Sequence, residues 1–151
     1  MITAIILSVL LVSCTSAIHF EALTFFSLFA NRFIHLPRFI ILSAMLFLPM
    51  VHVLEITLYA AVYYYLTDTL GLGTFSGNFS DTFSNYLYYS AETFSSLGFG
   101  DILPRGAIRL VTGIEVLNGL LLIAWSGSFV FILMQRYWKI DGSTTHHRST
   151  H

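Results

Sequence analysis

The stretch LYYSAETFSSLGFGD, residues 87–101, determines how this sequence is interpreted. It continues an aromatic, moderately apolar run that begins at residue 83, and it ends with Gly98 and Gly100 at alternate positions before Asp101. The apolar part, residues 83–94, is too short to cross a hydrocarbon core about 30 Å thick. Glycine adopts backbone conformations that other residues resist, which lets successive carbonyl groups point the same way. The stretch therefore predicts a half-helix followed by an irregular segment that enters the membrane and returns.

Three long apolar stretches accompany this segment, at about residues 2–29, 39–66 and 107–138. Each exceeds the roughly 20 residues that a membrane-spanning helix requires. The composition agrees, because 56% of the 151 residues are hydrophobic, 10% are charged and the mean hydropathy is +0.75. A net charge of −1 provides no basic surface for nucleic acid. Cys14 is the single cysteine and has no partner for an intrachain disulfide.

We therefore expect an all-α membrane protein with three transmembrane helices and one re-entrant segment. The orientation follows from basic residues, which are retained in the cytoplasm when they flank membrane helices. Arg32 and Arg38 flank the first connection, and Arg136, Lys139 and Arg148 follow the last helix. With three crossings, both groups lie inside only if the N-terminus is outside and the C-terminus is cytoplasmic.

Residues 87–101 resemble the pore helix and selectivity filter of the potassium-channel superfamily, whose filter consensus reads TVGYGD. The chain is most similar to small bacterial channels with two pore-forming helices per subunit, over about residues 84 to 131. This resemblance implies a homotetramer in the bacterial inner (plasma) membrane that passes potassium ions passively. It implies no enzymatic activity and no cofactor beyond potassium ions in the pore. The expected partners are potassium ions, the lipid bilayer and other copies of the chain.

The resemblance also divides the chain into parts. An extra N-terminal transmembrane helix occupies residues 1–30, and the pore domain occupies residues 37–138. Within the pore domain we expect an outer helix at 39–66, an extracellular turret at 67–82, a pore helix at 83–95, a filter at 96–101 and an inner helix at 107–138. A short cytoplasmic tail at 139–151 follows.

In the filter, the resemblance implies that backbone carbonyls line the ion path and that the Ser96 hydroxyl closes the innermost site. The sequence departs from the consensus at three positions, with Ser96 for Thr, Leu97 for Val and Phe99 for Tyr. Phe99 lacks the hydroxyl that ties the filter to the pore helix in the family, and we expect Tyr88 and Tyr89 to supply hydroxyls from the other side. The expected ion-binding residues are Ser96, Leu97, Gly98, Phe99 and Gly100.

Three carboxyl groups are expected to support this filter. Glu92 and Asp101 match a pair that shares a proton in proton-activated bacterial relatives, and two carboxylates in contact cannot both ionise easily. The alternative is that Asp101 lies in water while Glu92 accepts from backbone amides. Glu115 is expected to brace the pore helix through the hydroxyl of Tyr88, Tyr89 or Ser90.

By the resemblance, Gly119 takes the position of the gating hinge in the inner helix. A glycine inside a helix weakens it by about 1 kcal/mol relative to alanine, so a bend there costs little. Gly113 and Gly127 are rival hinges, and close helix packing explains all three glycines equally well. Below the hinge, residues at helical spacing would line the cavity and the inner gate: Leu120, Ile123, Gly127 and Phe131.

The apolar helices also contain ionisable side chains, which are costly in a membrane and mark functional candidates. His19 lies about 20 Å outward from Arg32 and His52 about 21 Å outward from Arg38, at 1.5 Å per residue. At this shared depth His19, Glu21, His52 and Glu55 form a candidate site for zinc or another divalent ion. Proton sensing by the histidines is a second interpretation. A polar contact that only fixes helix packing is the third.

Alternative functions remain open at this point. The altered filter also suits a weakly selective cation channel, and the pore fold also suits a non-conducting auxiliary membrane subunit. A membrane metalloenzyme built on the histidines and glutamates is disfavoured, because the sequence has no H-E-x-x-H motif.

Overall fold

The computed structural model describes residues 2–33 and 35–145, with side chains up to residue 136. Its elements are α1 (Ile2–Arg32), α2 (Pro37–Tyr64), the π-helical turn η1 (Tyr65–Thr69), β1 (Gly73–Gly77), α3 (Phe83–Phe94), β2 (Ile102–Gly106) and α4 (Ile108–Thr145). Three helical segments are long and apolar enough to cross a membrane, namely Ile2–Arg32, Pro37–Thr69 and Ile108–Arg136. The predicted all-α membrane architecture is confirmed.

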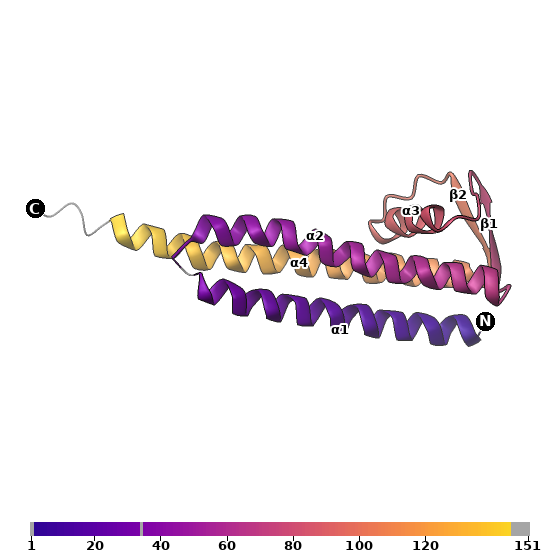
Figure 1. Ribbon diagram of the computed structural model, residues 1–151, viewed down its shortest axis with the longest axis horizontal. Coiled ribbons are helices and arrows are strands. Elements are labelled where there is room, and N and C mark those ends of the chain that lie inside the picture. Colours follow the sequence, from indigo (N-terminus) through magenta and orange to yellow (C-terminus); the bar gives the residue numbers. More distant parts are fainter. Residues whose placement is uncertain (1, 34, 146–151) are drawn as a thin grey trace, which may run out of the picture.

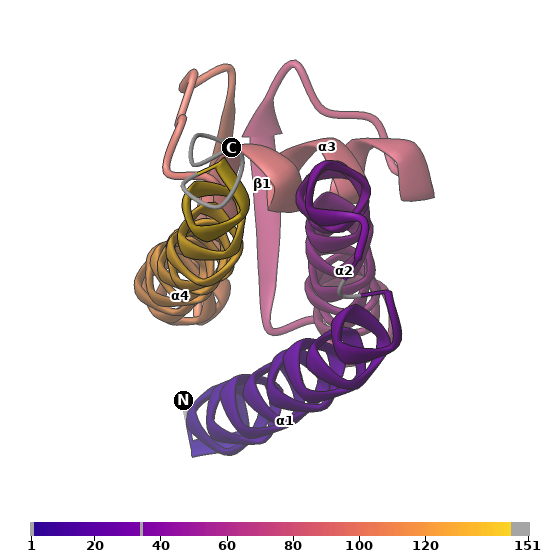
Figure 2. The same ribbon diagram turned by 90° about the vertical axis from the view of Figure 1, so that its left-hand side faces the viewer.

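The three long helices lie side by side along their length, and α3 and the two strands gather at one end of them (Figure 1). Helix α1 begins at that same end, and α4 ends at the opposite end. Figure 2 shows α1 on the side of the α2 and α4 pair that faces away from α3. The first helix is therefore packed against both helices of the pore unit and not against α2 alone.

The connection between α2 and α3 contains a strand that the sequence analysis missed. β1 pairs antiparallel with β2, in a register from Gly73 opposite Gly106 to Gly77 opposite Ile102. The strand lies within the segment expected to form an extracellular turret, residues 67–82. A Cβ atom at Gly73 would collide with the Arg105 carbonyl, and one at Gly77 with the Asp101 carbonyl. The glycines thus allow close pairing of two backbones, which a composition rich in turn-forming residues does not reveal.

Two apolar clusters hold the helices together. The larger one lies around α3 and is built on aromatic rings from α2 and α3, including Tyr59, Tyr63, Tyr86, Tyr89 and Phe94. The smaller one joins α1, α2 and α4 toward the other end, through Phe26, Ala30, Ile40, Ala44 and Leu133. The aromatic cluster determines where the re-entrant segment sits relative to the spanning helices.

The last helix runs further than expected. The tail was predicted from residue 139, whereas α4 continues to Thr145. Residues 139–145 contain no proline, which is the residue that ends a helix most strongly. Loss of the apolar pattern marks the end of a membrane span and does not by itself end a helix.

Gly119 lies where the end of α3 approaches α4 most closely. A Cβ atom added at Gly119 would overlap the Phe94 carbonyl and approach the Phe94 ring. Nothing lies within 4 Å of the corresponding position at Gly113 or Gly127. The α4 helix is continuous through Gly119. Close packing therefore explains Gly119 in this conformation, and the hinge remains a prediction.

Gly119→Ala should lower the stability of the folded protein, because the added methyl group forces α4 and the end of α3 apart. Overpacking of this kind costs roughly 1–3 kcal/mol. Gly113→Ala is the matched control, since its Cβ enters open space and should stabilise the helix by up to about 1 kcal/mol. Thermal unfolding in detergent measures both changes. An equal loss of stability in the two variants would contradict this account of Gly119.

Candidate ion-conducting site and buried polar clusters

The backbone amides that follow α3 turn back onto the end of that helix. Four successive N–H groups, those of residues 96–99, find acceptors in its last turn. Ser96 donates to the Thr93 carbonyl (3.0 Å), Leu97 and Gly98 donate to the Glu92 carbonyl (2.8 and 3.3 Å), and Phe99 donates to the Glu92 carboxylate (3.2 Å). All amides in this run are thereby satisfied without any regular secondary structure.

The carbonyl side of the same run is free. Within the described chain, the carbonyl oxygens of residues 96–99 accept no hydrogen bond, and all four residues are exposed. The φ angle is positive at Ser96 (60°), Gly98 (53°) and Gly100 (78°), and these residues alternate with Leu97 and Phe99, which have negative φ. Carbonyl oxygens that accept no hydrogen bond from the described residues are able to coordinate a cation.

The two tyrosines expected to support the filter do different things. The Tyr88 hydroxyl lies 3.3 and 3.5 Å from the two oxygens of the Asp101 carboxylate, at the end of the filter. The Tyr89 hydroxyl instead lies 2.8 Å from the Thr112 hydroxyl on α4. Tyr88 thus contacts the end of the filter directly, whereas Tyr89 fastens α3 to the inner helix.

The expected contact between Glu92 and Asp101 is absent from the described residues. Glu92 accepts from the Phe99 amide, and Asp101 accepts from Tyr88. The arrangement follows the alternative interpretation for Glu92, because an irregular backbone leaves the Phe99 amide in need of an acceptor. Burial raises the pKa of Glu92, and the negative charge of Asp101 raises it further, while the Phe99 amide opposes both.

Glu115 joins three elements at the level of α3. Its carboxyl group is fully buried and accepts from the Ser90 hydroxyl on α3 and from the Tyr63 hydroxyl on α2, both at 2.5 Å. The expected contact with Ser90 is present, whereas Tyr88 and Tyr89 bond elsewhere. Tyr63 was not anticipated, because three consecutive tyrosines at 63–65 give no sign of which one faces the interior.

A second polar cluster joins α1, α2 and α4. His19 and His52 stack with ring centroids 5.3 Å apart, and each Nδ1 atom lies 2.9 Å from a different oxygen of Glu55. Their Nε2 atoms both face the Ser126 hydroxyl, at 3.2 and 3.0 Å. Three of the four residues grouped by depth in the sequence are therefore brought together, and Ser126 is an addition.

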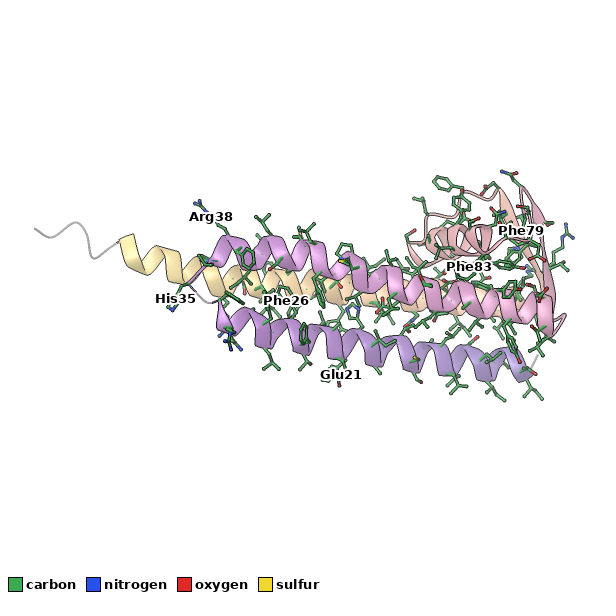
Figure 3. All side chains as sticks on the ribbon, in the orientation of Figure 1. Glu21, Phe26, His35, Arg38, Phe79 and Phe83 are labelled. Carbon is green, nitrogen blue, oxygen red and sulfur yellow. The ribbon has the colours of Figure 1, made fainter. Side chains whose placement is uncertain are left out.

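Glu21 does not belong to this cluster. It is exposed, and Figure 3 shows it on the outer side of α1, pointing away from α2 and α4. Glu21 follows His19 by two residues, a spacing that turns it about 200° around the helix axis. The expectation that Glu21 joins His19, His52 and Glu55 is therefore wrong, because Glu21 faces away from them.

Asn118 forms a further connection between α1 and the pore unit. Its buried side-chain amide donates to the Thr15 hydroxyl on α1 (2.8 Å) and to the Tyr59 hydroxyl on α2 (3.1 Å). The sequence analysis did not single out Asn118. The sequence offered one indication that Asn118 is buried. It precedes the apolar Leu122 by four residues, so the two side chains lie on the same, buried face of α4.

The residues expected below the hinge are exposed on α4. Leu120, Ile123, Gly127 and Phe131 all lie on its surface in the single chain. Ile123 and Gly127 also border a cavity of about 270 Å³ between α2 and α4. This face of the helix is available either to an ion pathway or to another copy of the chain.

Comparison with known proteins agrees with this geometry. A family model described as "Ion channel" matches residues 39–136, which extend from α2 through the span of α4. The chain belongs to the ion channel family. Its pore domain is of the potassium-channel type, as predicted, and with three apolar helices it is a multi-pass membrane protein. The match begins after α1. Searches of curated proteins and of solved structures gave no match.

Glu115→Ala should destabilise the re-entrant segment of this ion channel, because the Ser90 and Tyr63 hydroxyls lose a shared buried acceptor. The expected loss is roughly 2–4 kcal/mol of unfolding free energy. Glu21→Ala, on the exposed side of α1, is the control and should change little. Thermal unfolding and the ratio of potassium to sodium flux measure the effect. Unchanged stability and selectivity in Glu115→Ala would sink this prediction.

We expect the stability of the protein to change with pH above 4.5, the ordinary pKa of a glutamate, because the pKa of Glu92 is raised. Because the pKa is raised in the folded protein, the neutral carboxyl is favoured there. The corresponding stability is present below pH 4.5 and is lost as the pH rises through the raised value. Glu92→Gln should remove this step from the pH profiles of thermal stability and ion flux. Glu21→Gln should retain it, and a step that persists in Glu92→Gln would assign the response to another group.

Proposed function

We propose that the protein is a potassium-selective channel in which four identical chains surround one pore and conduct ions passively. The observation that carries this proposal is the run at residues 96–99, where every amide is bonded to α3 and every carbonyl is exposed and free. Carbonyl oxygens arranged in rings replace the hydration shell of an ion. Backbone groups do this chemistry, so the replacement of Thr, Val and Tyr by Ser96, Leu97 and Phe99 is compatible with it.

The tetramer is supported by what one chain lacks. A single run of carbonyls provides one wall of an ion path, and rotational symmetry is the usual way to provide the others. Leu97 and Phe99 are 59% and 65% exposed, which is high for apolar side chains beside a structured helix. Contact with a neighbouring copy would cover them. In the same assembly, Leu120, Ile123, Gly127 and Phe131 would line the cavity and inner gate.

The orientation is part of the proposal. Figure 3 places His35 and Arg38 at the end of the helices opposite Phe79 and Phe83. If basic residues remain in the cytoplasm, the filter, the β1–β2 pair and the N-terminus lie outside. The bacterial inner membrane is the location that fits the resemblance to small bacterial channels.

A weakly selective cation channel is the second candidate, and one observation favours it. The Tyr88 hydroxyl and the Asp101 carboxylate are separated by 3.3 Å or more and lie at the surface, so this support for the outer end of the filter is weak. A filter held loosely at that end would adapt to sodium more readily.

The test is ion flux through purified protein in liposomes under a potassium gradient, repeated with sodium and with barium. We expect potassium flux that exceeds sodium flux and that barium blocks. Gly98→Ala should abolish it, because alanine resists the positive φ of 53° although no atom lies within 4 Å of its Cβ position. Glu21→Ala, on the exposed side of α1 that faces away from α2 and α4, should conduct normally.

The other outcomes distinguish the alternatives. If potassium and sodium flux are equal and Gly98→Ala abolishes both, the protein is a weakly selective cation channel and not a potassium-selective one. A folded tetramer without flux at acid and neutral pH would overturn the proposal in favour of an auxiliary subunit. Flux that survives Gly98→Ala would show that residues 96–100 are not the ion path.

A further inference from the structure

The cluster of His19, His52, Glu55 and Ser126 lies between three helices that the apolar clusters alone would hold together. His19 and Glu55 are completely buried, and Ser126 and the His52 side chain are 7% and 16% exposed. Buried polar groups at membrane depth are expensive, so a simpler helix contact would be apolar. The arrangement calls for a reason beyond packing.

Counting hydrogens shows what the cluster lacks. Four contacts link its members, two from Nδ1 atoms to Glu55 and two from Nε2 atoms to Ser126. If Glu55 is ionised and both rings are neutral, the Nδ1–H groups fill the first two contacts. The Ser126 hydroxyl then has one hydrogen for two facing Nε2 lone pairs. One contact is left with two acceptors and no donor.

We infer that this cluster is a binding site for a divalent cation of the zinc class. The ligands are Nδ1 of His19, Nδ1 of His52 and a carboxylate oxygen of Glu55. With the metal on Nδ1, each ring carries its hydrogen on Nε2. The Ser126 oxygen, which has two lone pairs, accepts both. Every contact is then satisfied, and a metal-bound histidine donating its other N–H to a fixed acceptor is the usual outer arrangement of such sites.

The distances suit this assignment. Each Nδ1 atom already lies 2.9 Å from a Glu55 oxygen, and two ligand atoms at about 2.0–2.1 Å from a tetrahedral zinc are about 3.3 Å apart. One ligand atom from each of the three residues can be chosen so that all lie within 4.8 Å of one another. The Nδ1–oxygen distances thus differ from the tetrahedral spacing by about 0.4 Å, a change within reach of side-chain rotation.

The donor set selects the class of ion. Two imidazole nitrogens and one carboxylate are typical ligands of zinc and related transition metals. Calcium and magnesium prefer sites made of oxygen atoms. Three protein ligands leave a fourth position that a water molecule can fill, as in zinc sites with three protein ligands.

Metal at this place would clamp α1 to the pore unit. His19 belongs to α1, His52 and Glu55 to α2, and Ser126 to α4, next to Gly127 in the proposed cavity face. Binding would thus couple the first helix to the inner helix of the channel. This inference does not rest on ion selectivity or conduction.

The experiment measures zinc on the full-length protein in detergent. His146, His147 and His151 lie outside the described residues and are replaced by alanine in every sample, because a histidine-containing tail binds metal by itself. After equilibration with zinc chloride and removal of free metal, elemental mass spectrometry should find one zinc per chain. Zinc should also raise the unfolding temperature of this protein.

Matched variants test the ligands. Glu55→Gln and His52→Gln should weaken zinc binding roughly tenfold or more and abolish the rise in unfolding temperature. Glu21→Gln on the exposed side of α1 and His35→Ala near the start of α2 should bind zinc as the parent does. His52→Gln serves as the second variant if Glu55→Gln fails to fold, since His52 is partly exposed.

Two results would overturn the inference. The first is a folded parent protein that retains no zinc and gains no stability from it, which would leave the cluster as a polar contact whose missing hydrogen is an extra proton. The second is equal zinc binding in the parent and in His52→Gln. Neither result bears on the proposed channel function, because that function is tested separately, by ion flux in liposomes with the Gly98→Ala variant.

Discussion

The need to satisfy every backbone amide at membrane depth governs this structure. Residues 96–99 are irregular, and an unpaired N–H in a water-poor environment costs several kcal/mol. The end of α3 meets this need with the Thr93 and Glu92 carbonyls and the Glu92 carboxylate. Because the C=O and N–H groups of a trans peptide point in opposite directions, bonding these amides turns the carbonyls of residues 95–98 away from their acceptors. The same constraint explains why Glu92 bonds Phe99 instead of Asp101, and why a glutamate occupies the last turn of α3.

Polar side chains hold the helices in register, because apolar packing between membrane helices has little directional preference. Glu115 links α4 to both α2 and α3, and Asn118 links α4 to α1 and α2 three residues later. Gly119 then brings α4 against the end of α3. Polar contacts and close approach thus occur on consecutive turns of one helix. The position of α3 and of the irregular run after it is therefore set by contacts with α4 as well as with α2.

The sequence predicted the elements that depend on local pattern and composition. The three spans, the half-helix and the irregular run were recognisable because apolar length and alternate glycines are visible in one dimension. It did not predict the β1–β2 pair, whose glycines serve a long-range contact and resemble a turn. For side chains, helical rise placed His19 and His52 at the same depth correctly, whereas Glu21 was wrongly grouped with them. Which side a residue faces depends on helix rotation, and α1 is apolar nearly all round.

The first helix, α1, lies outside the part of the chain that the family model matches, yet it is joined to α2 and α4 by buried polar contacts. The family match begins at residue 39, after α1. Yet α1 makes buried polar contacts with the pore unit at two levels, through Thr15 with Asn118 and through His19 with Glu55 and Ser126. A helix that merely anchors a protein in lipid does not require polar groups on the face it shares with its neighbours. Buried polar pairs specify one orientation and depth, since sliding or rotating α1 would separate Thr15 from Asn118 and His19 from Glu55. The first helix is therefore an integral part of this channel's transmembrane core, positioned to influence α4 directly.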